Sequence, residues 1–271
     1  MGILNITPDS FSDGGRFFDT DIALAHAERM VRAGADILDI GGESTRPYSD
    51  PVSAQEEADR VLPVIENLSG RIPIPISIDT TKAAVARQAL EAGAAIVNDI
   101  SALRMDPEMA SVAARFGAPL ILMHMKGTPK TMQVDPRYED LMGEILEFLE
   151  AAVQTAMAGG MPRHLLIADP GVGFGKTVDH NLCLIRRLSA LEPLDMPILV
   201  GSSRKAFIRA ILKREGEADM EPTLPAVETG TQATVAAAIL SGAHIVRVHD
   251  VERTVATARI IDAVRNVSDN P

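Results

Sequence analysis

A short pattern that recurs four times along the chain limits what it can fold into. In each copy a segment with helical spacing ends at a glycine, an alanine follows, and a short apolar run comes next. The glycines are Gly34, Gly93, Gly117 and Gly242. Glycine is favoured just after a helix because it tolerates a positive φ there. The recurrence predicts one repeated helix and strand unit rather than two unlike domains.

Eight apolar runs rich in Ile, Leu and Val are separated by polar turns and longer helical segments. We expect strands at residues 2–6, 36–40, 74–79, 95–99, 120–124, 165–169, 198–202 and 245–249. Their continuous apolar character is typical of parallel strands covered on both faces. Eight such units predict an α/β fold, a single (β/α)8 TIM barrel over residues 1–271 with parallel strands and mobile βα loops. An open doubly wound sheet is the competing arrangement.

Composition excludes several classes of protein. The chain has 271 residues, 46% of them hydrophobic, which excludes a disordered or fibrous protein. No apolar run reaches the roughly 18 residues of a membrane span, and the first residues lack a secretory signal, so we expect a cytoplasmic protein with no membrane partner. The net charge of -11 would repel a nucleic-acid backbone. We therefore expect a small-molecule ligand held by a few local cations.

Polar residues stand at or just beyond the end of each expected strand. They are Asn5, Asp39, Asp79, Asn98, Asp99, His124, Asp169, Ser202, Arg247 and His249. A single polar residue in such a place is usually a helix N-cap. Eight strands in succession with this feature are harder to explain by capping, because the strand ends of a barrel converge at one mouth. Such a ring either satisfies itself in a closed network or faces a polar ligand.

Three of these polar residues, together with Lys205 after the seventh expected strand, suit a flat heterocycle. Asp79, Asn98, Asp169 and Lys205 supply acceptors, an amide that both donates and accepts, and one mobile cation. They match a ring with N–H groups, an exocyclic amine and a carbonyl. A structural ion pair between an aspartate and Lys205 is the alternative.

Four further segments bear on the site. Arg247 and His249 share one face of the last strand and suggest an anionic group there, since barrels often bind phosphate at that place. The loops 7–17 and 41–51 have the composition of lids that exclude water, although ordinary surface loops are an equal alternative. The run 169–176 ends like a nucleotide-binding loop, but its glycine spacing is one residue short.

Taken in order, the motifs resemble those of one enzyme family. MGILNITPDSFSDGG, ADILDIGGESTRP, PISIDT, IVNDIS, GTPKTMQ, DPGVGFGK, GSSRK and VRVHD closely resemble the dihydropteroate synthases of folate biosynthesis, from residue 2 to about residue 265. The resemblance implies a TIM barrel that condenses 6-hydroxymethyl-7,8-dihydropterin pyrophosphate with 4-aminobenzoate in the presence of Mg²⁺. The products are 7,8-dihydropteroate and pyrophosphate, and we expect ordinary sulfonamide sensitivity.

The resemblance also assigns residues to subsites. The pterin pocket falls on Asp39, Asp79, Asn98, Met123, Asp169, Lys205 and Arg247. The diphosphate site falls on Asn5, Arg247 and His249, with Asn5 as the Mg²⁺ contact. The aminobenzoate side falls on Phe11, Thr45, Pro47, Phe174, Ser203 and Lys205. Asp13 and Arg46, from the two loops, join Asp79 and Lys205 as the expected catalytic residues.

These roles predict a reaction in which diphosphate leaves before the arylamine attacks. Mg²⁺, Arg247 and His249 would stabilise the leaving group, and Asp79 would offset positive charge on the ring. Family members usually carry a short segment before the first strand, whereas here Met1 adjoins it, so we expect less cover at the bottom of the barrel. The apolar segment 231–241, read with the resemblance, suggests a homodimer, although such a helix also suits a core.

Two other readings stay open. Corrinoid-dependent methyltransferases share the barrel and the pterin pocket, but they have less use for the arginine of GGESTRP and for the cluster SSRK. A barrel that binds pterin without catalysis would be free to lose Asp13, Arg46 and Lys205, and all three are present.

Overall fold

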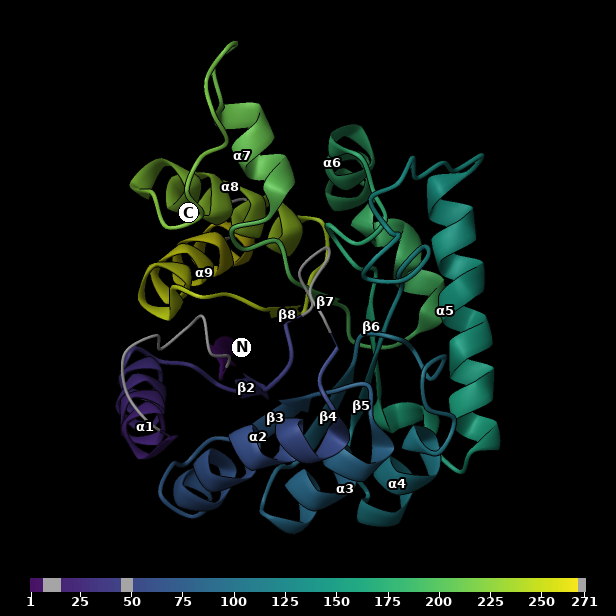
Figure 1. Ribbon diagram of the computed structural model, residues 1–271. Helices are drawn as coiled ribbons and strands as arrows, with labels where there is room; N and C mark the ends of the chain where they lie inside the picture. The colour runs from purple at the N-terminus through teal and green to yellow at the C-terminus, as the bar shows by residue number, and fades with distance from the viewer. Residues whose placement is uncertain (7–15, 45–50, 268–271) are drawn as a thin grey trace.

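The computed structural model of the protein describes residues 1–6, 16–44 and 51–267, in which strands and helices alternate (Figure 1). The strands are β1 (Gly2–Asn5), β2 (Leu38–Gly41), β3 (Ile76–Asp79), β4 (Ile96–Asp99), β5 (Leu120–Met123), β6 (Leu166–Asp169), β7 (Leu199–Val200) and β8 (Ile245–Val246). The helices are α1 (Arg16–Arg32), α2 (Ala54–Leu68), α3 (Ala83–Glu91), α4 (Met109–Phe116), α5 (Leu141–Ala158), α6 (Val178–Arg186), α7 (Ala206–Leu212), α8 (Pro225–Leu240) and α9 (Val251–Asn266), with 3-10 turns η2 (Arg163–Leu165) and η3 (Leu188–Leu194). Each predicted strand overlaps an observed one.

The strands form a closed parallel ring. β1 to β6 pair side by side in chain order, and β7 pairs with β8. Two single bridges join these sheets: Ala168 pairs with Ile198, and Gly2 pairs with Val248. The strand order has no reversal, so the predicted TIM barrel is confirmed and the open doubly wound sheet is excluded.

The helices surround the ring of strands, as Figure 1 shows. In α5 the apolar residues Ile145, Leu149 and Val153 recur every four positions and are buried, which places one stripe of the helix against the barrel. The glycine that follows α4, Gly117, has φ of 62° and closes the helix in the left-handed conformation, as the recurring pattern predicted. No helix in the described ranges is long and apolar enough to span a membrane.

Side chains inside the barrel lie in layers, and this layering places the site. Ile96, Ile121 and Leu199 pack with Met1 to fill the lower part of the barrel. Successive inward positions on a strand are two residues apart. The next inward positions toward the carboxyl ends, two residues after Ile37, Ser77, Ile96, Ile121, Ile167 and Ile245, are Asp39, Asp79, Asn98, Met123, Asp169 and Arg247. The polar layer therefore lies at the mouth, directly above an apolar plug.

Candidate active site

Arg247 joins three strands across the mouth of the barrel. It follows β8, and its backbone N–H donates to the carbonyl of Val200 at 2.9 Å. Its Nε donates to Oδ2 of Asp39 at 2.6 Å, and its Nη2 donates to Oδ2 of Asp79 at 2.6 Å. One guanidinium thus holds the carboxylates of β2 and β3 together, and these carboxylates do not pair with Lys205.

Burial shifts the charges of this cluster. Removal from water raises the pKa of Asp79 to about 7, with Arg247 opposing the shift and Asp39 adding to it. Burial also raises the pKa of Asp169 to about 6, against the hydrogen bond from the Gly171 N–H. Burial alone would lower the pKa of Arg247, but Asp39 and Asp79 raise it overall. The guanidinium is therefore charged throughout, while Asp79 changes its charge near neutral pH.

Several buried acceptors in the mouth lack a partner among the described residues. Asn98 donates from Nδ2 to Oδ2 of Asp39 at 3.1 Å. Oδ1 of Asp39 and Oδ1 of Asn98 make no hydrogen bond within the described ranges, and neither does Oγ of Ser77, one layer below them. Buried polar atoms are normally satisfied, so the two acceptors at the mouth suit a ligand that carries N–H groups. Ser77 was missed by sequence reasoning, although its place two residues before Asp79 on one strand could have indicated it.

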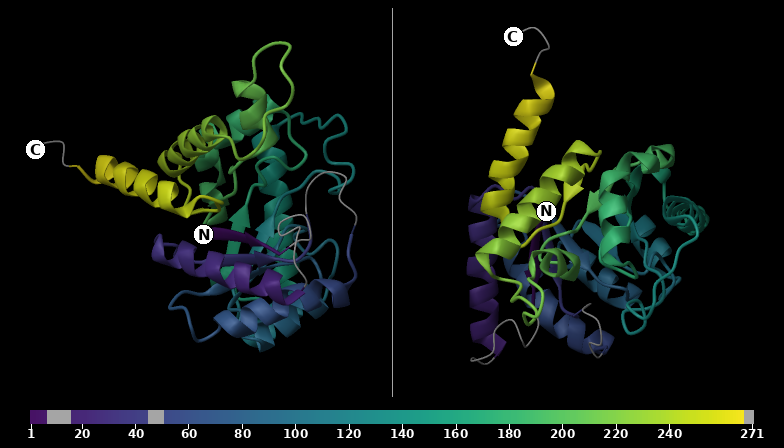
Figure 2. Two further views of the ribbon diagram at one scale, coloured as in Figure 1. Left: turned by 60° about the vertical axis from the view of Figure 1, so that its left-hand side comes forward. Right: turned by 90° about the horizontal axis from the view of Figure 1, so that it is seen from above.

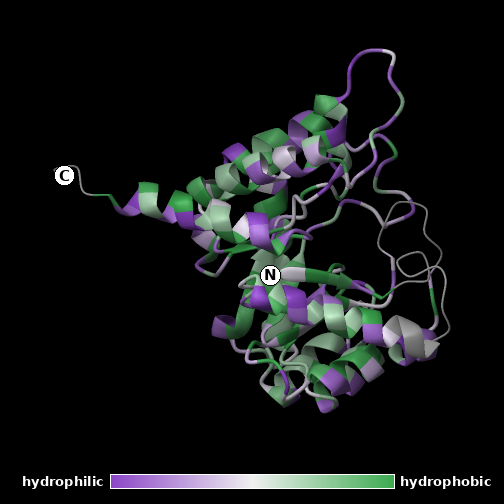
Figure 3. Ribbon diagram, turned by 90° about the vertical axis from the view of Figure 1, so that its left-hand side faces the viewer, coloured by the Kyte–Doolittle hydropathy of each residue, from purple (hydrophilic) through white to green (hydrophobic). Residues whose placement is uncertain are grey.

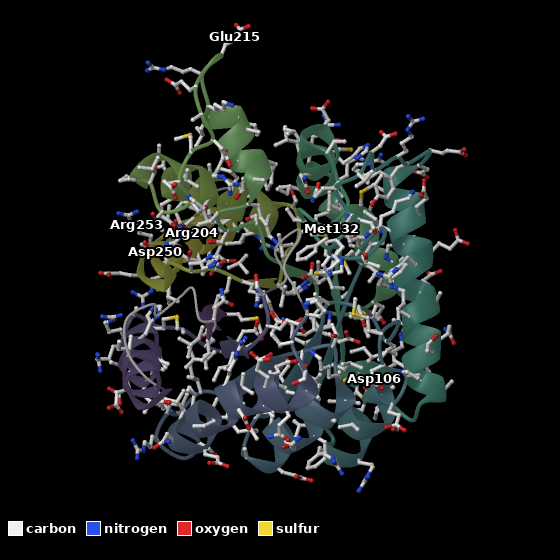
Figure 4. The ribbon with its side chains drawn as sticks, in the orientation of Figure 1. Asp106, Met132, Arg204, Glu215, Asp250 and Arg253 are labelled. Carbon is white, nitrogen blue, oxygen red and sulfur yellow. The ribbon has the colours of Figure 1, made fainter. Side chains whose placement is uncertain are left out.

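A second part of the site lies at the ends of β5, β6 and β7. The ammonium of Lys205 lies 3.9 Å from the centre of the Phe174 ring, a cation–π contact. Burial and then the charge of Arg247 lower the pKa of Lys205 to about 8, with Asp169 and Asp79 opposing the shift. Phe174 packs in an apolar cluster with Met123, Ile100, Met125 and Met132, the last of them labelled in Figure 4. The structure thus brings together three predicted residues, Met123, Phe174 and Lys205.

The predicted anion side is formed by residues at or just beyond the carboxyl ends of β1, β7 and β8. Oγ of Ser203 and Nδ1 of His249 are 2.9 Å apart, and the His249 N–H donates to Oγ of Ser203 at 3.3 Å. Asn5, the last residue of β1, is half-buried at the same mouth. Ser203 precedes Arg204, which adopts the left-handed conformation with φ of 59°. This turn brings both Ser203 and Lys205 from one short segment into the region of the site.

Other polar residues near the strand ends serve the fold. The carboxylate of Asp99 accepts from the backbone N–H groups of Ser101 and Leu103, so it shapes its own loop. Ser202 shares a hydrogen bond with Thr234 of α8. Neither residue is the N-cap of the helix that follows its strand, since those caps are Glu108 and Lys205, so the capping interpretation does not account for them. Five predicted residues lie outside the described residues: Phe11, Asp13, Thr45, Arg46 and Pro47.

Comparison with known proteins agrees with this geometry. A family model described as pterin binding enzyme matches residues 1–249. A dihydropteroate synthase of Synechocystis is 50% identical over 97% of this chain and 89% of its own length. The dihydropteroate synthase of Yersinia pestis, solved with a sulfonamide drug, has a TM-score of 0.89 and 45% identity over 98% of this chain and 94% of that one. The enzyme of Clostridium difficile, solved in the presence of pteroic acid, has a TM-score of 0.90 and 45% identity over 98% of this chain and 96% of that one.

Proposed function

The chain belongs to the pterin-binding enzyme family, and from this premise we propose that it acts as a dihydropteroate synthase. It condenses 6-hydroxymethyl-7,8-dihydropterin pyrophosphate with 4-aminobenzoate and releases 7,8-dihydropteroate and pyrophosphate. The observation that carries the proposal is the pair of unpartnered buried acceptors on Asp39 and Asn98, beside the guanidinium of Arg247, within the described part of the chain.

The polar layer at the mouth supports recognition of the pterin. Oδ1 of Asp39 and Oδ1 of Asn98 can each accept a hydrogen bond from a ring N–H or an exocyclic amine. Asp169 adds a carboxylate to those of Asp39 and Asp79. One of its oxygens already accepts from the Gly171 N–H at 2.7 Å. Met123 offers an apolar surface for the flat face of the ring. This donor and acceptor pattern discriminates strongly, because a ligand without the matching N–H groups leaves buried acceptors unpaired.

The chemical step breaks the bond between the pterin methylene carbon and the diphosphate oxygen, which keeps the electron pair. The amine nitrogen of aminobenzoate then bonds to the methylene carbon and loses one proton. Asp79, when ionised, offsets the positive charge that develops on the ring. Among the described residues, Nε and Nη2 of Arg247 donate to the carboxylates of Asp39 and Asp79. Nη1 is therefore left to bind the departing diphosphate.

The diphosphate side suits Mg²⁺ that arrives with the substrate. The described residues hold no cluster of three or more His, Cys, Asp or Glu that could bind a metal, and the amide oxygen of Asn5 is a hard donor at the mouth. Mg²⁺ is commonly held by one or two protein oxygens together with substrate phosphates, so this sparse donor set fits. When bound, the ion would neutralise charge on the leaving group. His249, held by Ser203, is the neighbouring donor to the same anion.

The aminobenzoate side is proposed at Phe174, Ser203 and Lys205, with the undescribed Phe11, Thr45 and Pro47. Phe174 supplies an aromatic face, and Lys205 supplies a cation beside it. Asp13 and Arg46 are proposed to complete the catalytic set with Asp79 and Lys205. Exclusion of water matters, since water would capture the same electron-poor carbon.

The proposal is tested by pyrophosphate release. The purified chain, given pterin pyrophosphate, 4-aminobenzoate and Mg²⁺, should release pyrophosphate and form dihydropteroate in equal amounts. Omission of aminobenzoate is the control and should abolish most release. Methyl transfer from methyltetrahydrofolate to a corrinoid, without pyrophosphate release, would instead support the methyltransferase alternative.

The outer surface supports a homodimer. α9 projects from the body of the protein (Figure 2), and hydrophobic positions recur along it (Figure 3). Ile260, Val264 and Val267 are 66%, 59% and 65% exposed. Contiguous apolar surface of this kind is typical of an interface between proteins. Light scattering that gives the mass of one chain would contradict a dimer.

The cytoplasmic location and the single domain over residues 1–271 stay predictions.

A further inference from the structure

Lys176 is a buried lysine that the proposed reaction does not use, and burial lowers its pKa to about 7, with the charge of Asp169 opposing the shift. The residue is 3% exposed and belongs to the loop that joins β6 to α6. Nζ lies 2.9 Å from Nδ1 of His124, 3.0 Å from the carbonyl oxygen of Gly171 and 3.2 Å from the carbonyl oxygen of Phe174. An ammonium has three hydrogens and no acceptor site, so it matches three acceptors around it.

The chemistry of His124 agrees with this assignment. Burial and then the charge of Lys176 lower the pKa of His124 to about 2, so the imidazole is neutral. A neutral imidazole has one nitrogen that accepts and one that donates. When Lys176 is protonated, Nδ1 therefore accepts from the ammonium, and the imidazole proton stands on Nε2. His124 follows β5, so this hydrogen bond ties the loop after β6 to the neighbouring strand.

The ammonium bridges the two ends of one tight turn. The Phe174 N–H donates to the carbonyl of Gly171 at 3.1 Å, and Lys176 binds the carbonyl oxygens of both residues. Gly171 has a second tether, because its N–H donates to Asp169 at 2.7 Å. The carbonyl of Phe174 is held by Lys176. Loss of the ammonium should therefore displace Phe174 more than it displaces Asp169.

We propose that Lys176 is a positioning residue that fixes this turn and so holds the Phe174 ring against the ammonium of Lys205, on the aminobenzoate side of the site. The inference rests on the proposed function for the identity of that ligand. Lys176 itself is covered by the turn and touches no substrate. Its effect on the reaction is transmitted through the backbone of Phe174.

Kinetics separate positioning from general support of the fold. Lys176→Met should raise the KM for aminobenzoate about tenfold or more, because small displacements of a binding group are costly. The Kd for pterin pyrophosphate, measured by calorimetry, should change less than about twofold, because Asp169 keeps its hydrogen bond from Gly171. Lys126→Met is the matched control: Nζ of Lys126 donates to Glu144 and to the backbone carbonyl of Arg137, not to the carbonyls of the turn, so its loss should leave both constants unchanged. Lys176→Arg, which keeps the charge, should restore part of the loss.

A fluorescence reporter tests the same inference without turnover. The chain has no tryptophan, so Phe174→Trp places a single indole at the turn. Adding Lys176→Met should raise the acrylamide quenching of that indole, whereas adding Lys126→Met should not. Unchanged quenching in a folded protein would overturn the inference, and so would equal losses of pterin and aminobenzoate affinity. Absence of pyrophosphate release by the unmodified chain would count against the proposed function instead.

If Lys176→Met does not fold, two variants of His124 test the same inference. His124→Leu removes one acceptor of the ammonium, and His124→Asn retains an acceptor of similar position. The leucine variant should show the raised KM for aminobenzoate, and the asparagine variant should stay close to the unmodified chain. The same KM for both variants and the unmodified chain would overturn the inference.

Discussion

Nη2 of Arg247 lies 2.6 Å from Oδ2 of Asp79, although 168 positions separate the two residues in the chain. The contact spans the mouth of the barrel from β8 to β3, and Asp39 shares the same guanidinium. When both carboxylates are ionised, they carry one negative charge more than the single cation that they share balances. That excess is available to balance positive charge on a bound ring.

Asp79→Asn should lower turnover far more than it weakens pterin binding. The amide keeps the size of the side chain and a hydrogen-bond acceptor, but it removes the charge that offsets the developing cation. We expect kcat to fall about a hundredfold or more, as for loss of other groups that stabilise a transition state. Steady-state pyrophosphate release gives kcat, and calorimetry gives the Kd for the pterin substrate. Equal kcat in the two proteins at saturating substrate would discredit this role.

The pH profile should be bell-shaped. Asp79 must be ionised, and burial raises its pKa to about 7, so kcat/KM should rise with pH up to that point. Lys205 must keep its proton, and burial lowers its pKa to about 8, so activity should fall above that value. In Asp79→Asn the acidic limb should move to about 6, where Asp169 loses its proton. An acidic limb that stays at the same pH in the variant would assign it to another group.

Gly171→Ala should destabilise the protein more than Gly117→Ala. Both glycines are left-handed, with φ of 69° and 62°, so the backbone strain of alanine is similar at both positions and costs about 1 kcal/mol. At Gly171 an added methyl group would overlap the carbonyl oxygen of His124, whereas at Gly117 nothing lies within 4 Å. We expect Gly171→Ala to cost about 3 kcal/mol in all, the scale of overpacking. Urea unfolding of both variants measures the difference, and equal losses would rule out the overlap.

Lys82→Met should be strongly destabilising, and Glu57→Gln should relieve part of the loss. Nζ of Lys82 lies 2.6 Å from Glu57, whose side chain is fully buried, and 2.6 Å from Glu43. Without the lysine, Glu57 is a buried carboxylate with no cation, which costs about 3–5 kcal/mol. Unfolding of the single and double variants gives the coupling energy. Additive losses would show that the two residues do not act as a pair.

The repeated pattern predicted the barrel correctly because each feature was local. Helix spacing, the glycine after the helix and the apolar run all lie within one unit, and Gly117 shows the expected left-handed cap. The residues of the mouth were also predictable, since strand ends such as Asp79 and Asn98 converge in any barrel.

The sequence alone does not predict which residues form ion pairs across the barrel. Arg247 pairs with Asp39 and Asp79 because of the ring closure, which sets distances between residues about 200 positions apart. In the sequence Lys176 stands out only as the end of a run that resembles a nucleotide-binding loop but lacks its glycine spacing. Two of its partners are backbone carbonyls, and these leave no mark on residue types.

Phe174→Ala should weaken aminobenzoate and sulfonamides together. The ring provides both the aromatic face and the cation–π partner of Lys205, so its loss removes contact area and leaves the ammonium less well held. We expect the KM for aminobenzoate and the inhibition constant of sulfamethoxazole each to rise about tenfold, the effect of one good contact. Phe116→Ala, at a ring that is 42% exposed on α4, is the control and should change neither constant. If the inhibition constant stays fixed while the KM rises, the drug and the substrate do not share the Phe174 surface.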